Sequence, residues 1–233
     1  MLAIFRREMS TYFSSPLGYV FLAVFYFFSG MFFYYVLYQG TTDLSYVFSS
    51  LFSILIFIIP LLTMRLMSEE KKQKTDQLLL TSPASLSGIV YGKFFAALCM
   101  YAIALSVTVV YSVIVASYAT PEWLVVIGSI LGAFLIGAAL ISVGLFISAL
   151  TESQMVAAIV SFGVMMAIFM IDDIATIISN TTISQFVASL SFMSRYKDLT
   201  AGMMSLSTVF FFASVIFMFN FLTIRMLERK RWG

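Results

Sequence analysis

Six long runs without Asp, Glu, Lys or Arg constrain the fold of this chain more than any other feature. They cover residues 9–42, 44–64, 94–121, 123–151, 153–171 and 199–224. Each is close to or longer than the roughly 20 residues that an α-helix needs to cross the hydrocarbon core of a membrane. Backbone polar groups in lipid must be paired within their own segment, which favours helices. The sequence therefore predicts an all-α polytopic membrane protein with six transmembrane helices in a single domain over residues 1–233.

The composition agrees with a membrane protein. Only 10% of the 233 residues are charged, whereas soluble domains carry about 25%. With six spans, 11 of the 13 Lys and Arg residues fall on the side of the N-terminus and two on the other side. Cytoplasmic loops carry the excess of basic residues. We therefore expect both termini to be cytoplasmic.

The segments outside these spans have their own patterns. In residues 1–14, apolar side chains recur near helical spacing and Arg6, Arg7 and Glu8 share the other side, which is typical of a helix lying at the membrane interface. Residues 174–202 are less apolar and contain one apolar helical face. They predict short helices that lie on the outer leaflet or dip into it.

Three features inside the spans suggest local structure. Pro60 should kink the second span or break it. Lys93, at the start of the third, could reach the surface through its long side chain. Gly128-x-x-x-Gly132 in the fourth matches a motif for close helix approach, and it favours packing within the bundle over a dimer seam.

The charged stretch from Ser68 to Lys93 lies between the second and third spans. Glu69 to Leu80 predicts a short helix, which Ser82-Pro83 should stop. Two readings of it remain: a solvated loop whose charges keep it out of the membrane, or a surface for a cytoplasmic partner. The candidate contact residues are Glu69, Glu70, Lys71, Lys74, Thr75, Asp76, Leu78, Leu79, Ser82 and Pro83.

Two further sites carry carboxylates. The short link Thr151–Gln154 contains Glu152 and predicts a second, smaller cytoplasmic contact between two antiparallel helices. Asp172 and Asp173 follow the fifth span at its outer border. They could line an outer exit, pair with Arg195 or Lys197, or simply end the helix.

The residue types exclude several chemistries. The chain has no His and one Cys, so a Ser–His or Cys–His pair is impossible and no ligand cluster has metal spacing. We expect no catalytic residue, no bound metal and no nucleic acid partner. Gly88 to Phe94 lacks the spacing and the hydroxyl residue of a phosphate-binding loop. No carboxylate lies near mid-bilayer, where coupled transporters usually need one, so energy for uphill transport would come from another protein.

Two motifs resemble a known family. The first runs from Tyr12 to Phe21, and the second combines Glu70, the stretch Thr75–Pro83 and the pair Gly92-Lys93. With six spans, the whole chain resembles the permease subunits of ABC-2 type transporters, particularly those of the gliding-motility-associated subgroup. One departure is Lys74, where that family often has Gly.

The resemblance implies an ABC-2 permease fold of the type V exporter kind in a bacterial plasma membrane. Two permease chains, alike or related, would pair among membrane lipids, each on a subunit of a dimeric cytoplasmic ATPase that binds ATP and Mg²⁺. The permease would bind no cofactor. Residues 68–83 would be the coupling helix, residues 1–14 the elbow helix, and residues 174–202 the outer-leaflet helices, with an accessory subunit outside as a further partner.

Three functions follow from these features. The first is the membrane subunit of an ATP-driven exporter. The second is a membrane anchor on which an ATPase acts on envelope or motility proteins without transport. The third is a channel or carrier that needs no ATPase.

Overall fold

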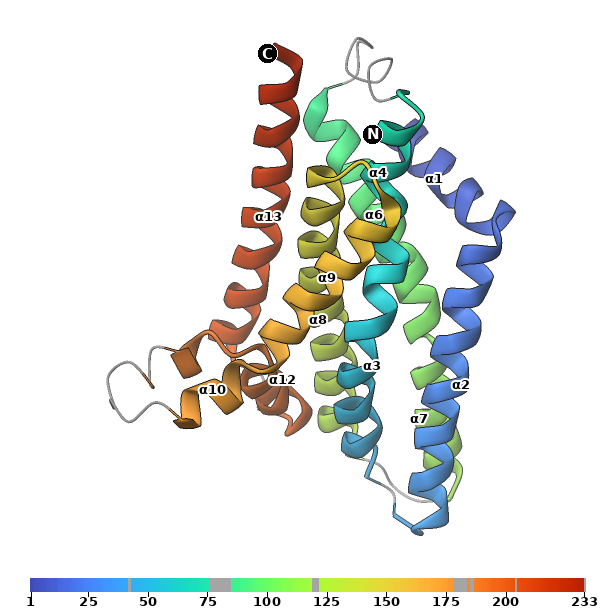
Figure 1. Ribbon diagram of the computed structural model, residues 1–233. Helices are drawn as coiled ribbons and strands as arrows, with labels where there is room; N and C mark the ends of the chain where they lie inside the picture. Colours follow the sequence, from blue (N-terminus) through green and yellow to red (C-terminus); the bar gives the residue numbers. More distant parts are fainter. Residues whose placement is uncertain are drawn as a thin grey trace.

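The structure, a computed structural model, is entirely helical in the part of the chain that it describes (Figure 1). That part comprises residues 1–41, 43–75, 85–118, 122–177, 184, 187–203 and 205–232. The helices are α1 (Leu2–Ser14), α2 (Pro16–Tyr38), α3 (Ser45–Thr63), α4 (Arg65–Lys72), α6 (Leu86–Leu105), α7 (Val107–Tyr118), α8 (Trp123–Leu150), α9 (Gln154–Phe169), α10 (Ile171–Ile177), α12 (Phe192–Thr200) and α13 (Leu206–Trp232). The all-α prediction is confirmed.

Several helical segments of the described chain are long and apolar enough to cross a membrane. Five segments are long and apolar enough without a neighbouring helix: Pro16–Tyr38, Ser45–Lys72, Leu86–Tyr118, Trp123–Leu150 and Leu206–Arg229. A sixth is formed if α9 and α10 count as one span, since the two helices meet at a bend of 46°. The structure therefore agrees with a multi-pass protein and gives five to six spans.

Two spans are interrupted. The helix α3 continues past Pro60, and the chain turns at Met64 before α4 begins, so the break comes four residues after the proline. The third predicted span starts earlier than expected, at Leu86, and breaks at Ser106. The Ser106 hydroxyl donates to the carbonyl oxygen of Ile103 at 2.6 Å, a bond of the kind that bends helices.

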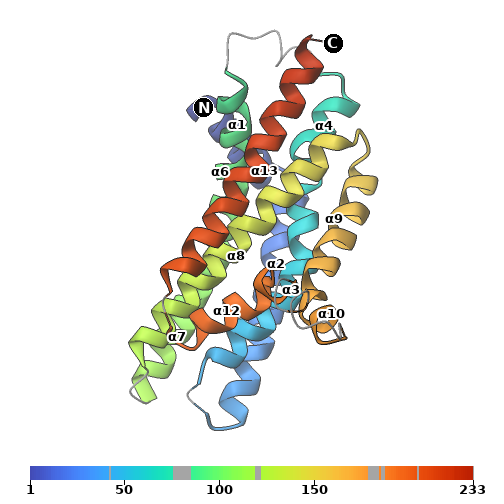
Figure 2. The same cartoon turned by 90° about the vertical axis from the view of Figure 1, so that its left-hand side faces the viewer.

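The helix α8 is the centre of the bundle (Figures 1 and 2). It packs against α3, α4, α6, α9, α12 and α13, and it is buried along most of its length. A helix that is apolar around its whole circumference can be covered on every side. In contrast, α2, α9 and α13 expose many large apolar side chains, as helices do when they face lipid or another subunit.

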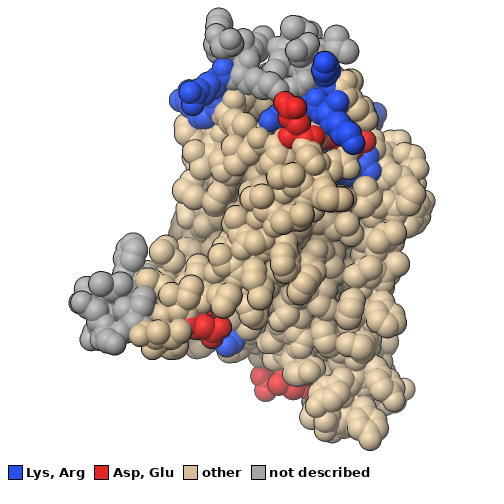
Figure 3. Space-filling view, in the orientation of Figure 1, with Lys and Arg blue, Asp and Glu red and all other residues tan. Residues whose placement is uncertain are grey.

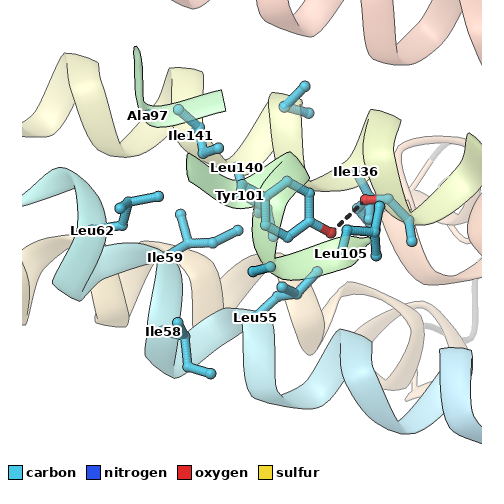
Figure 4. Packing of buried hydrophobic residues seen from close by; sticks show 14 of the residues in the cluster. Leu55, Ile58, Ile59, Leu62, Ala97, Tyr101, Leu105, Ile136, Leu140 and Ile141 are labelled. Carbon is cyan, nitrogen blue, oxygen red and sulfur yellow. Dashed lines mark hydrogen bonds between the residues drawn. The ribbon is translucent and has the colours of Figure 1, made fainter. Parts of the chain in front are cut away.

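Small residues let other helices approach α8 closely. A Cβ atom on Gly137 would lie 2.2 Å from the ring of Tyr101, and one on Gly144 would lie 2.3 Å from Oγ1 of Thr63. The Tyr101 hydroxyl donates to the carbonyl oxygen of Ala133 at 2.7 Å. Figure 4 shows this ring enclosed by apolar side chains of α3 and α8. The bundle is therefore tightest where α3 and α6 cross α8.

The glycine motif in α8 is used within the chain. A Cβ on Gly128 would lie 2.7 Å from the carbonyl oxygen of Leu199, and one on Gly132 would lie 3.0 Å from its Cβ. Leu199 belongs to α12, which therefore occupies this face of α8. The packing interpretation of the motif is confirmed, and a dimer seam at these two glycines is wrong.

The helix α12 lies in the region predicted to form short outer helices, and it is packed firmly into the bundle. Its Tyr196 hydroxyl donates to the carbonyl oxygen of Phe48 at 2.9 Å. The rings of Tyr196 and Phe52 stack with centroids 5.8 Å apart, and Phe52 also stacks on Phe169 at 5.6 Å. These contacts join α12, α3 and the end of α9.

We predict that Gly137→Ala destabilises the protein, because the added methyl group would overlap the fully buried ring of Tyr101. Overpacking of this kind costs about 1–3 kcal/mol. Gly163→Ala is the matched control, since it adds the same group within α9 at a position with no atom within 4 Å. The thermal unfolding midpoint in detergent should fall only for Gly137→Ala. Equal midpoints for the two variants would contradict the packing described.

Candidate functional site

One end of the bundle brings together α1, α4, the start of α6, the end of α8 and both chain termini (Figures 1 and 2). Lys and Arg side chains gather at this end together with Glu side chains, and few charged residues lie at the other (Figure 3). The described basic residues that the positive-inside rule groups together thus lie at one end of the molecule. The predicted contact residues that the structure describes belong to this end: Glu69, Glu70, Lys71, Lys74, Thr75 and Glu152.

The helix α4 leads out of the bundle at this end. It follows α3 after the turn at Met64, and the two helices form a single span candidate of 28 residues. Two hydrogen bonds end α4: the N–H of Thr75 donates to Glu70 O at 2.9 Å, and the N–H of Lys74 donates to Lys71 O at 3.0 Å. This pair of bonds is the usual way to end a helix with a left-handed residue.

The predicted helix over residues 69–80 is wrong in its described part, since α4 begins at Arg65 and ends at Lys72. Residues 76–80 of that prediction lie outside the described residues. Lys74 has φ = 57°, in the left-handed region that favours glycine and costs other residues about 1–2 kcal/mol. This is the position at which the ABC-2 permeases that the sequence resembles often have Gly. The candidates that lie outside the described residues are Asp76, Leu78, Leu79, Ser82 and Pro83.

The last turn of α8 holds α4 in place. The Ser148 hydroxyl accepts hydrogen bonds from the backbone N–H groups of Met67 at 3.1 Å and Ser68 at 3.2 Å. The buried ammonium group of Lys71 donates to the carbonyl oxygen of Ala149, at a helix C-terminus, where a positive charge is favoured. The end of α8 and α4 therefore form one packed unit.

A buried ion-pair network joins α4 to α1 and α6. Its centre is Lys93, whose side chain is 1% exposed. The Lys93 Nζ lies 2.9 Å from Oε1 of Glu8 and 3.0 Å from Oε1 of Glu70, and it donates to Leu66 O at 2.6 Å. Arg7 pairs with both carboxylates, at 2.8 Å from Oε1 of Glu8. One ammonium group thus connects three helices.

The prediction that Lys93 reaches the membrane surface is therefore wrong. An ammonium group has three protons to donate, and here each has an acceptor, so the charge is buried without an unpaired donor. The preceding Gly92 allows α1 to come close: a Cβ there would lie 3.1 Å from the side chain of Ile4 and from the carbonyl oxygen of Met1. Gly92 thus leaves room for α1, and Lys93 binds the carboxylate of Glu8 on that helix.

A second set of contacts ties the end of α1 to α3 and α4. Arg65 Nε pairs with Glu69 Oε2 at 3.0 Å, and its Nη1 donates to Ser15 Oγ at 2.8 Å. The buried hydroxyl of Tyr12 donates to Leu62 O at 3.0 Å. The first helix is therefore held to the bundle near both its middle and its end.

The network favours the charged forms of Glu8 and Arg7. Burial acts to raise the pKa of the Glu8 carboxyl, but attraction to Lys93 and Arg7 outweighs it, and the pKa lies below its ordinary value of 4.5. Burial likewise acts to lower the pKa of Arg7, and the carboxylates of Glu8 and Glu70 outweigh it, so that pKa is raised. Both ion pairs are intact at neutral pH.

A polar pocket of about 260 Å³ opens beside the network between α1 and α4. Its charged lining consists of three cations and three carboxylates: Arg7, Arg65, Lys93, Glu8, Glu69 and Glu70. Because these charges balance and pair with one another, the pocket has no excess charge with which to hold a small ion.

The structure brings together the two predicted contacts. Glu152 is exposed in the short turn between α8 and α9, three residues after Ala149, to which Lys71 is bonded. Among the other candidates, Glu70 belongs to the network, Glu69 pairs with Arg65, and Lys74 is exposed. The two contacts thus lie at one end and are joined through the end of α8.

The acidic pair at the opposite end is placed differently from expectation. Asp172 and Asp173 lie in the first turn of α10, beyond the bend that ends α9. Neither makes an ion pair with Arg195 or Lys197 in the part of the chain described, and Arg195 donates instead to Ser189 O at 3.0 Å. The pairing alternative is therefore wrong for these residues.

Sequence reasoning missed the centre of the site. The sequence placed Arg7 and Glu8 on an interfacial helix and Lys93 at the end of the charged stretch, but it did not predict that they bind one another. One signal was available: Glu8 is a carboxylate within the first predicted helix, and Lys93 is a cation at the start of a span. Both need partners where the membrane begins.

We predict that Lys93→Met destabilises the protein strongly, because it leaves two buried carboxylates without their main cation. Removing one member of a buried ion pair costs about 3–5 kcal/mol. Lys93→Arg should restore most of the stability, and Lys72→Met serves as the control at an exposed position. Thermal unfolding in detergent measures all three. A Lys93→Met protein as stable as the control would refute the network.

The lowered pKa of Glu8 predicts a pH dependence. Its ionised form contributes stability that is fully present above the ordinary pKa of 4.5 and is lost as the pH falls through the lower folded-state value. Glu8→Gln removes this contribution. Between about pH 6 and about pH 3, the unfolding midpoint should therefore fall further for the wild type than for Glu8→Gln. If the unfolding midpoints of the wild type and Glu8→Gln fall in parallel with pH, Glu8 does not form the ion pairs described.

The comparisons with known proteins agree with this architecture. A family model described as "ABC-2 family transporter protein" matches residues 17–194, which is more than half of the chain. The match covers α4, the start of α6 and the turn after α8, and it begins after α1. A search of curated proteins finds no match.

Proposed function

The chain belongs to the ABC-2 family of transporter proteins, and from this we propose that it is the permease subunit of an ATP-driven exporter. A separate cytoplasmic ABC ATPase would bind ATP and Mg²⁺ and hydrolyse the nucleotide, so this chain itself would be no enzyme and bind no cofactor. The end that carries α4 would face the cytoplasm, with both termini, in a bacterial plasma membrane.

One observation carries this proposal: α4 lies at the charged end of the bundle and is bonded to three other helices. Lys93 and Arg7 tie it to α6 and α1, and Ser148 ties it to α8. A force on α4 would therefore reach the central helix directly, as a coupling element requires. A helix in a loosely held loop would absorb the force instead.

The rest of the assembly follows from the family. A second permease chain, of the same or a related kind, would complete the path, and the permease pair would sit on two ATPase subunits. Glu152 would provide a lesser ATPase contact. The outer end, with Asp172, Asp173 and α12, would form the exit, where an accessory subunit could bind. The gliding-motility-associated subgroup fits the two sequence motifs.

A photo-crosslinking amino acid at Gln73 tests the proposal. Gln73 is exposed at the end of α4, so we expect crosslinking in native membranes to capture a protein with a phosphate-binding loop. Tyr118, 85% exposed at the end of α7, is the control at the opposite end of the bundle (Figure 1), and it should capture no ATPase.

The outcomes separate the competing functions. Capture of no ATPase at Gln73, with the complex otherwise intact, would contradict the proposal and favour a channel or carrier. If an ATPase is captured, its hydrolysis rate in the purified complex is measured with candidate substrates. Stimulation by a substrate supports an exporter, and an ATPase that responds only to envelope proteins supports the anchor.

A further inference from the structure

The charged side chains of α4 and its end divide into two groups. The carboxylates of Glu69 and Glu70 form ion pairs within the chain, Glu69 with Arg65 and Glu70 with Arg7 and Lys93. In contrast, the ammonium groups beyond them, on Lys72 and Lys74, are exposed, and neither forms an ion pair in the part of the chain that the structure describes. The outward charge of this described segment is therefore positive, although its sequence contains both signs.

The length of the second span shows where Lys72 and Lys74 lie relative to the membrane. The span candidate Ser45–Lys72 has 28 residues, which at 1.5 Å per residue is about 42 Å. The hydrocarbon core is only about 30 Å thick. Lys72 therefore lies at or beyond the headgroup layer, and Lys74 follows it. Both ammonium groups are exposed, so a protein that docks on the end of α4 can reach them.

We infer that the ATPase cleft that receives α4 is acidic, with Asp or Glu side chains facing Lys72 and Lys74. This inference rests on the proposed function and specifies the chemistry of the partner surface. Acidic side chains of the partner would find no competition from Glu69 and Glu70, which the chain's own cations already neutralise. A basic cleft would instead place like charges against these lysines, which costs affinity.

The fixed backbone strengthens this assignment. The left-handed turn at Lys74 and the two hydrogen bonds that end α4 hold both lysines on a short, ordered segment. Charges at the rim of an interface mainly set the rate of association and its dependence on salt. Lys72 and Lys74 would therefore select the partner and orient it, while apolar contacts supply the remaining affinity.

The experiment compares charge variants in the complete complex. Tagged permease is purified gently from native membranes, and the ATPase that remains bound is quantified at increasing NaCl concentrations. We expect Lys72→Glu with Lys74→Glu to retain about tenfold less ATPase than the wild type at low salt. Lys72→Gln with Lys74→Gln should give an intermediate loss and a weaker salt dependence.

Arg6→Glu is the matched control, because Arg6 is exposed on α1 at the same end and forms no ion pair within the described chain. It should retain ATPase like the wild type. Each variant is also checked by its unfolding midpoint in detergent, which should not change, since none of the three residues is buried.

Each result of the retention experiment supports one conclusion. Equal retention by the wild type and the double Glu variant would overturn the acidic cleft while leaving the permease function intact. If that variant loses only binding to vesicles that contain phosphatidylglycerol, the lysines face anionic lipid and the inference is wrong. If the wild type retains no ATPase at any salt concentration, the proposed function fails together with the inference.

Discussion

The position of α4 depends on one buried ammonium group. The side chain of Lys93 is only 1% exposed, so its charge depends on the carboxylates of Glu8 and Glu70 within bonding distance. Those carboxylates come from two different helices, and α1 and α4 are therefore fixed relative to α6. An apolar contact would tolerate sliding, whereas hydrogen-bonded charges fix both distance and direction. At the charged end of the bundle, α1, α4 and α6 are thus held in fixed relative positions.

The rigidity continues into the bundle through small residues. Ser148 joins α4 to the end of α8. Nearer the middle of α8, Gly144 contacts the side chain of Thr63, and Gly137 contacts the ring of Tyr101. At both glycines a side chain of the neighbouring helix lies directly against the backbone of α8, which leaves little room for independent movement. A displacement of α4 would therefore move α3, α6 and α8 together. This is why the site and the fold are best understood as one mechanical unit.

Much of the fold could be predicted from the sequence, and the site only in part. Long charge-free runs must become helices in lipid, so α2, α3, α8 and α13 follow from composition alone. The burial of Lys93 could not be predicted, because a charge near a span border satisfies the same pattern whether it faces water or a carboxylate. The end of α4 also escaped prediction, since Lys74 adopts a backbone conformation that its residue type disfavours.

The helix α9 is less buried than the helices at the charged end of the bundle. The helix α9 buries only Ala157, Ser161 and Met165, and it joins α8 through a turn of three residues. It packs against α3, α4 and α8 on one side, while many of its other apolar side chains remain exposed. Its other end stacks on Phe52 through Phe169, beside the bend into α10. Because α9 buries far fewer side chains than α8, fewer contacts fix its angle within the bundle than fix the angle of α8.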